Sequence, residues 1–190
     1  MHYRLVKRLI DVAVSALVLL LLAPLLLALA VLVRIDSPGN PLFSQVRVGR
    51  GGRVFTMLKF RSMVKNADKI GSYSTADNDA RITRMGAFLR KTSLDELPQL
   101  INVLTGDMSL VGPRPDVPAQ QGNYLPQHWK RRLGVQPGVT GLAQVNGRSN
   151  VTPKKRLAYD LLYARRMSLL LDMRIVLKTV AMVLKREGVN

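Results

Sequence analysis

The sequence predicts an α+β protein, mainly helical, with a membrane segment at its N-terminal end. Three observations predict this class: a long uncharged apolar run near the N-terminus, two short β-like runs separated by a glycine-rich turn, and apolar residues at helical spacing near the C-terminus. A chain of 190 residues is long enough for one domain with its own core. We therefore expect a membrane segment within residues 1–35 and one integrated unit over residues 36–190.

Charge and composition restrict both the partners and the chemistry. The 29 basic residues outnumber the 12 acidic ones, and a net charge of +17 indicates nucleic acid, a phosphorylated small molecule or an anionic membrane face as partner. Aromatic residues make up only 5% of the chain and do not alternate with the basic ones, so we expect no nucleic-acid binding. Without cysteine, and with only two histidines, the nucleophile must be a carboxylate, a hydroxyl or water.

The apolar run from Val12 to Val33 is long enough to enter a membrane. It contains 22 residues without a charge, and about 20 suffice for a helix to cross the hydrocarbon core. A secretory signal peptide also begins with basic residues, but Asp11 stands at the head of this run, and the run is long and continues to Arg34. We therefore predict a membrane segment.

Pro24, in the middle of the run, bears on the topology of this segment. A proline removes one helical hydrogen bond, and each half of the run is then about 15 to 18 Å long against a hydrocarbon core of ~30 Å. Basic residues lie on both flanks, among them Lys7, Arg8 and Arg34, and the positive-inside rule places such flanks in the cytoplasm. A re-entrant helix-break-helix satisfies both observations, but membrane helices also tolerate proline, so the pattern alone leaves a kinked single span open.

A β-hairpin is predicted after the membrane segment. The runs LFSQVRVG (residues 42–49) and RVFTMLKF (residues 53–60) are β-like and flank the turn Gly49-Arg50-Gly51-Gly52. Backbone amides of such a turn can cradle a phosphate. A hairpin needs these glycines anyway, so we favour a plain turn.

Helices are predicted over much of the remaining chain. Residues 82–106 should form two helices that meet near Thr92 and Ser93, the second ending at Gly106, and a basic helix is expected over residues 153–166. Residues 168–188 place apolar side chains on one helical face: Leu169, Met173, Val176, Leu177, Val180, Val183 and Leu184. Such a helix lies in the membrane interface or covers the core, and the N-terminal membrane segment favours the interface.

Asp95 and Glu96, adjacent in the stretch SLDELPQL, are the best candidates for catalysis. Ser93 and Glu96 match a capping box, which would give the pair a purely structural role, although Pro98 then falls inside the helix. Either way we expect Asp95 in the first turn of a helix, where the helix dipole keeps a carboxylate ionised and attracts phosphate. Neighbouring residues do not share a helix face, so one carboxylate can attack phosphorus while the other holds Mg²⁺.

Arg114 is the candidate phosphate clamp. It lies between Pro113 and Pro115 in one of two glycine- and proline-rich segments, residues 106–116 and 134–148, that we interpret as loops. Stiff flanking backbone and a guanidinium that binds two phosphate oxygens suit this role. An ordinary surface arginine in a proline turn is the alternative.

Several motifs in the same order resemble the bacterial sugar transferases, and more narrowly the small monotopic polyprenol-phosphate phosphoglycosyl transferases that start glycoconjugate assembly. The resemblance covers nearly the whole chain. The matching segments are KRxxD (residues 7–11), the apolar run with Pro24, FSQVRVGRGGRVFTMLKFRSM (residues 43–63), TSLDELPQLINVLTGDMSLVGPRP (residues 92–115) and PGVTGLAQVNGR (residues 137–148).

The resemblance implies an enzyme of the bacterial inner membrane, monotopic on its cytoplasmic face. Its fold would combine a re-entrant membrane hairpin at residues 1–35 with a cytoplasmic-face catalytic domain at residues 36–190 that carries interfacial amphipathic helices. The implied partners are a UDP-sugar, polyprenol phosphate (undecaprenyl phosphate) and anionic membrane lipid. The alternative function is a non-catalytic basic protein of the membrane surface that binds anionic lipid or nucleic acid.

The resemblance also assigns roles to residues. Asp95 would attack the β-phosphorus of the UDP-sugar, release UMP and carry the phosphosugar, while Glu96 would coordinate Mg²⁺. The residues expected to bind substrate or phosphate are Arg114, Lys59, Arg90, Gln144, Asn146 and Arg148. Two departures stand out: Ala23 replaces the serine that many members have before the helix-breaking proline, and Leu142 stands where close relatives often have tryptophan.

Overall fold

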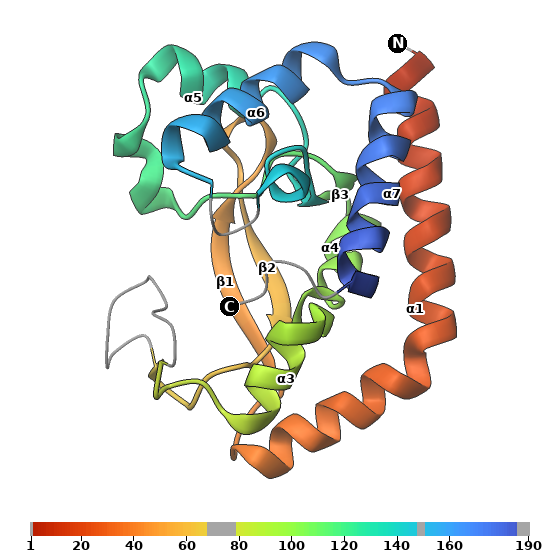
Figure 1. Cartoon of the computed structure of the whole chain (residues 1–190), viewed down its shortest axis with the longest axis vertical. Helices are drawn as coiled ribbons and strands as arrows, with labels where there is room; N and C mark the ends of the chain where they lie inside the picture. Colours follow the sequence, from red (N-terminus) through yellow and green to blue (C-terminus); the bar gives the residue numbers. More distant parts are fainter. Residues whose placement is uncertain (1, 68–78, 148–150, 186–190) are drawn as a thin grey trace.

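A computed structural model describes residues 2–67, 79–147 and 151–185. The described chain is mainly helical, as predicted, and contains two small sheets, of which the sequence predicted one. A hairpin of β1 (Leu42–Val48) and β2 (Val54–Phe60) runs through the centre, with α5 (Pro126–Arg132) and α6 (Pro153–Arg166) at one end and α3 (Arg84–Thr92) at the other (Figure 1). Helix α1 (His2–Asp36) forms one side, and α7 (Leu169–Lys185) lies beside its N-terminal part.

Helix α1 is continuous, which corrects the predicted helix-break-helix. All 35 residues are helical although Pro24 lies inside the element, and Figure 1 shows the helix changing direction between its N-terminal and C-terminal parts. A bend without a break is the usual response to an internal proline. Within the described residues, α1 is the one helix that is long and apolar enough to cross a membrane, and only 11% of its most apolar window is buried by the rest of the chain. A re-entrant topology stays a prediction.

The β-hairpin and its plain turn are confirmed. The strands pair antiparallel from Leu42 opposite Phe60 to Val48 opposite Val54. Three turn amides are already bonded: Gly49 to the Arg53 carbonyl, Gly51 to the Leu133 carbonyl and Gly52 to the Gly49 carbonyl. These amides have no free hydrogen for a phosphate, so the turn is not a phosphate cradle.

A second, two-stranded parallel sheet lies within the segments that were predicted as loops. β3 (Ser109–Val111) pairs with β4 (Gly138–Thr140). The two backbones come so close that a Cβ added at Gly138 would lie 2.0 Å from the Gly112 nitrogen. Strands of three residues are too short to show an alternating pattern, which is why the sequence did not predict them. This close approach of the two backbones fixes the point where the loop that carries Arg114 begins.

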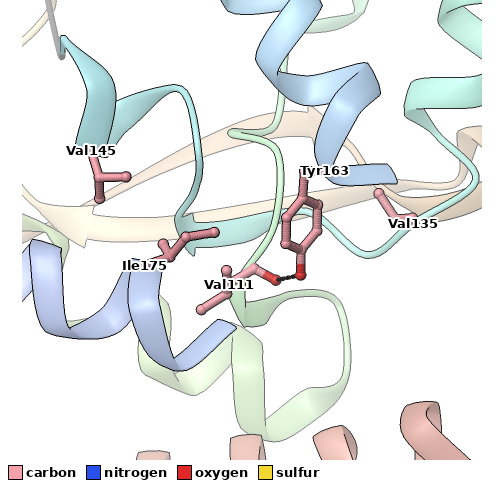
Figure 2. Packing of buried hydrophobic residues seen from close by; sticks show 5 residues of the cluster. All are labelled: Val111, Val135, Val145, Tyr163 and Ile175. Atoms are coloured by element: carbon pink, nitrogen blue, oxygen red, sulfur yellow. Dashed lines mark hydrogen bonds between the residues drawn. The ribbon is translucent and has the colours of Figure 1, made fainter. Parts of the chain in front are cut away.

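Two apolar clusters position the elements. One joins β3 to α6 and α7 through Val111, Val135, Val145, Tyr163 and Ile175, and the Tyr163 hydroxyl donates a hydrogen bond of 3.0 Å to the Val111 carbonyl (Figure 2). The other packs Leu29 and Val33 of α1 against Phe60 and Leu89, with Leu94 beside them. The C-terminal half of α1 therefore supports the turn that contains Asp95.

Helix α7 confirms the predicted helix but turns the predicted apolar stripe outward. Ile175 and Asp172 are buried, whereas Met173, Leu177 and Leu184 are 61%, 69% and 78% exposed. The stripe therefore does not cover the core. An apolar face left open on one side of an otherwise polar helix is typical of helices that lie in a membrane interface, and this location stays a prediction.

Candidate functional site

Asp95 and Glu96 lie in a single turn of 3₁₀ helix between two α-helices. α3 ends at Ser93, whose left-handed backbone (φ 58°) turns the chain, and the turn η2 (Leu94–Glu96) leads into α4 (Gln99–Thr105). The Ser93 side chain makes no capping hydrogen bond, so the capping box is wrong. Asp95 does lie in the first turn of a helix, as predicted, but that helix is the 3₁₀ turn η2. The α-helix α4 begins only after Pro98, where a missing amide costs nothing.

Asp95 is a buried carboxylate without a hydrogen-bond partner in the described part of the chain. Asp95 is only 8% exposed. Burial, and to a lesser extent repulsion from Glu96, raises its pKa to about 6, although Lys59, Arg114 and Arg90 pull that pKa down. A buried carboxylate whose ionised form is destabilised in this way is typical of a functional site.

Glu96, unlike Asp95, forms an ion pair. Its Oε1 lies 2.6 Å from Nη2 of Arg114, and this pair, with help from Asp95, raises the pKa of the Arg114 guanidinium. The structure therefore brings Arg114 to the two acids, as predicted. The two acids have different surroundings: Asp95 is buried near cations without an ion pair, whereas Glu96 forms an ion pair with Arg114.

Lys59 reaches the acids because α4 is fastened to β2. The Asn102 side chain accepts a hydrogen bond from the Leu58 amide at 2.9 Å and donates one to the Thr56 carbonyl at 2.8 Å. Burial and the nearby Arg114 lower the pKa of Lys59, and its ammonium group lies 5.4 Å from the centre of the Phe43 ring. A lysine destabilised in this way gains from any anion that arrives beside it.

A cavity of about 780 Å³ opens next to Lys59. Its described lining contains six basic residues and no acidic one: Arg47, Lys59, Arg61, Lys65, Arg81 and Arg90. Arg90 donates a hydrogen bond of 2.9 Å to Ser62, and the buried Nε of Arg47 has no partner among the described residues. Such a wall favours an anionic ligand, and it confirms that Arg90 and Lys59 lie together. Arg47 was not singled out from the sequence, because one arginine in an alternating strand resembles a solvent-facing residue.

The backbone that carries Arg114 is held by a buried ion network that the sequence did not predict. Arg132 bridges two carboxylates, at 2.6 Å from Asp116 and 2.8 Å from Asp160, and also donates to the Arg114 carbonyl. Arg156 pairs with Asp116 at 2.7 Å and donates to the same carbonyl at 3.3 Å. Arg132 of α5 and two residues of α6, Arg156 and Asp160, thus fix the loop that carries Arg114 and Asp116.

The predicted residues after β4 are not brought to Asp95. Gln144 donates to the Val139 carbonyl at 3.1 Å, and Asn146 donates to the Leu142 carbonyl at 2.7 Å. Both lie in the turn η4 (Gln144–Asn146), which packs against α7. Within the described residues, no hydrogen bond joins Gln144 or Asn146 to Asp95 or Arg114. Arg148 lies outside the described residues.

The carboxylates fit Mg²⁺ only if a ligand completes the coordination. The described parts of the chain hold no group of three or more His, Cys, Asp or Glu residues that could bind a metal by themselves. Mg²⁺ is commonly held by one or two carboxylates together with substrate phosphates and water. Glu96, whose Oε1 pairs with Arg114, would take part in that mode as one carboxylate ligand, with substrate phosphates and water completing the coordination.

Comparisons with known proteins identify the family of this chain. A family model described as bacterial sugar transferase matches residues 2–186. The UDP-glucose:undecaprenyl-phosphate glucose-1-phosphate transferase of Xanthomonas campestris pv. campestris is 49% identical over 98% of this chain and 40% of its own length. The protein of the same name from Klebsiella pneumoniae is 47% identical over 92% of this chain and 39% of its own length. A UDP-N-acetylgalactosamine-undecaprenyl-phosphate N-acetylgalactosaminephosphotransferase of Aeromonas hydrophila is 42% identical over 98% of this chain and 45% of its own length. The chain spans about two fifths of the length of these curated relatives.

Proposed function

Because the chain belongs to the bacterial sugar transferase family, we propose that it transfers a sugar-1-phosphate from a UDP-sugar to polyprenol phosphate and releases UMP. The observation that carries this proposal is the pairing of a buried, unpartnered Asp95 with a cationic wall. The wall suits the diphosphate of a nucleotide sugar, and the relatives' names specify UDP-sugars and undecaprenyl phosphate as their substrates.

The reaction proceeds in two displacements at one phosphorus atom. In the first, an Oδ atom of ionised Asp95 bonds to the β-phosphorus of the UDP-sugar, and the bond from that phosphorus to the bridging oxygen breaks, so UMP leaves with the electron pair. In the second, an oxygen of polyprenol phosphate bonds to the same phosphorus and the aspartyl oxygen leaves as a carboxylate. The products are polyprenyl diphosphate sugar and free Asp95, and no further reactant is needed.

The remaining groups bind and orient. Lys59 and Arg90 hold the phosphate oxygens beside Asp95, while Arg114, fixed by its ion pair with Glu96, stabilises charge that shifts onto the departing UMP. When Mg²⁺ is bound, it supplies further neutralisation of the diphosphate next to Glu96. The exposed apolar helix α1 would anchor the chain in the inner membrane with its catalytic unit on the cytoplasmic face, where the lipid acceptor lies.

The proposal is tested by mixing the purified chain with undecaprenyl phosphate and each of several UDP-sugars, and measuring UMP against time. At least one sugar should give enzyme-dependent UMP, at most one equivalent per chain without lipid and many equivalents with it, and chelation of Mg²⁺ should suppress it. If every UDP-sugar leaves both UMP and the thermal unfolding of the chain unchanged, the transferase proposal is wrong and a non-catalytic membrane-surface protein is left.

The rate of UMP release should fall as the pH drops below about 6. The first displacement needs ionised Asp95, and its pKa is raised to about 6 in the folded protein. The ionised fraction therefore falls about tenfold for each pH unit below that value, and kcat/KM should follow it. Initial rates of UMP release between pH 4.5 and 8 measure this profile. A rate that stays constant down to pH 4.5 would contradict the assignment of Asp95 as nucleophile.

A further inference from the structure

A second cavity lies at the N-terminal end of α1, separate from the site around Asp95. It measures about 290 Å³, and its lining comes from α1, the β1–β2 turn, β3, the segment before β4 and the end of α6. Gly106 lines it, which places it at the C-terminal end of α4, whereas Asp95 precedes the N-terminal end of that helix. The seven-residue helix α4, about 10 Å long, therefore separates the two sites.

Two of the four cations that line this cavity build its wall. Lys7 forms an ion pair with Asp172 of α7 at 2.9 Å. Arg8 donates to the carbonyls of Val103 and Leu104, the latter at 2.9 Å, at the end of α4 where carbonyls lack helical partners. These contacts fasten the start of α1 to the catalytic unit and leave little freedom to Lys7 and Arg8.

The other two cations, Arg4 and Arg50, have no such contacts. Both line the cavity and are exposed, and neither side chain makes a hydrogen bond or ion pair with any described residue. The acids nearby are already engaged: Asp11 accepts from the Leu110 amide at 3.2 Å, and Asp172 accepts from Lys7 and from two tyrosine hydroxyls. The cavity therefore keeps an excess of positive charge, supplied by two guanidinium groups.

The apolar character of α1 close to Arg4 indicates a lipid as the source of the matching anion. Leu5, Leu9 and Ile10 of α1 are exposed within two turns of Arg4, and the uncharged run of α1 begins directly after Asp11. Guanidinium groups bind phosphate oxygens bidentately, and exposed apolar residues at the same end of the helix suit acyl chains. We propose that this cavity binds the phosphate of an anionic lipid headgroup, with Arg4 approaching from α1 and Arg50 from the hairpin turn.

The experiment compares lipid binding by the full chain and by variants of the two arginines. Dioctanoyl phosphatidylglycerol, dioctanoyl phosphatidylcholine and inorganic phosphate are titrated separately into the detergent-purified chain, and bound lipid is counted by native mass spectrometry. Arg4→Gln and Arg50→Gln should each weaken phosphatidylglycerol binding by about tenfold or more, because a charge-assisted hydrogen bond is lost. Arg53→Gln is the matched control, since Arg53 is an exposed arginine of the same hairpin that does not line the cavity.

The two substitutions should not act independently. When both arginines bind one phosphate, the double variant loses less affinity than the product of the two single losses, and Arg53→Gln leaves the affinity unchanged. UMP release should stay the same in all variants, because neither arginine lies near Asp95. The proposal is overturned if the double variant binds phosphatidylglycerol as tightly as the unmodified chain. It is equally overturned if inorganic phosphate binds as tightly as phosphatidylglycerol, because the ligand is then free phosphate.

Discussion

Replacing Asp95 by asparagine should abolish UMP release. The substitution keeps the size of the side chain but removes the oxygen nucleophile, and loss of a nucleophile commonly costs a factor of about 10³ to 10⁶ in rate. Radiolabelled UDP-sugar without lipid acceptor gives a second readout, since the unmodified chain should retain a labelled sugar phosphate on denaturing gels. Asp95→Asn should retain none. A labelled adduct of normal amount in this variant would assign the nucleophile to another residue.

Glu96→Gln is the matched control, because it changes the adjacent carboxylate in the same way. Glu96 pairs with Arg114 and is not the proposed nucleophile, so its variant should still form the adduct, only more slowly. The dependence on Mg²⁺ should also weaken in this variant, because one carboxylate ligand of the metal is gone. If Glu96→Gln lost the adduct while Asp95→Asn kept it, the roles of the two residues would be reversed.

Asp95→Asn should also make the folded protein more stable at neutral pH. The folded-state pKa of about 6 lies above the ordinary aspartate pKa of 3.8, so the folded protein holds this proton more tightly than the unfolded chain does. Above pH 6 the buried, ionised carboxylate therefore costs stability, on the order of 2 kcal/mol, and the neutral amide avoids this cost. Thermal unfolding should show the gain at pH 7.5 and its disappearance as the pH falls toward 4. An inactive variant that is more stable than the parent has not lost activity by unfolding.

The sequence predicted the candidate site better than the shape of its surroundings. The junction of two helices near Thr92 and Ser93 and the glycine that ends α4 depend on local signals, and the structure confirms both. Arg114, which the family motif places at the phosphate site, lies beside Glu96. The capping box failed because a one-turn 3₁₀ helix and the start of an α-helix share the same residue preferences. The predicted break at Pro24 was wrong for a related reason. A proline in the sequence indicates that one helical hydrogen bond is missing, but it does not show whether the helix bends or ends there.

The contacts that the sequence did not reveal are those between distant segments. Gln144 and Asn146 lie in a family motif, but their amides bond to carbonyls of their own loop, and no local pattern indicates which way they face. Arg132 and Asp160 are 28 residues apart, on different helices, and only the folded chain brings them together with Asp116. In a chain with 29 basic residues, one more arginine on a basic helix carries no signal of its own.

Arg132→Gln should destabilise the folded protein by about 3 to 5 kcal/mol. Arg132 is buried between Asp116 and Asp160, and a neutral side chain leaves the Asp160 carboxylate without its ion pair in a buried position. Arg131→Gln removes the same charge from the exposed neighbour on α5 and should change stability by less than about 0.5 kcal/mol. Urea unfolding of the two variants in the same detergent measures the difference.

Adding Asp160→Asn to Arg132→Gln should restore part of the lost stability, because the uncompensated charge is then gone. Burial raises the pKa of Asp160, and Arg132 lowers that pKa, so without Arg132 the carboxyl should keep its proton to higher pH. Below its raised pKa the carboxyl of the Arg132→Gln variant is neutral, so the loss of stability should grow as the pH rises. Equal unfolding of Arg132→Gln and Arg131→Gln at neutral pH would show that the network contributes nothing to stability.

The same variant tests whether the network positions Arg114. Arg132 and Arg156 both donate to the Arg114 carbonyl, so the loss of one donor should let the guanidinium drift from Glu96. Measured well below the unfolding temperature, Arg132→Gln should therefore lower kcat for UMP release, and Arg131→Gln should not. The double variant with Asp160→Asn separates the two effects: it regains stability but not kcat, because the donor to the Arg114 carbonyl is still missing. Full recovery of kcat in the double variant would show that Arg132 acts through stability alone.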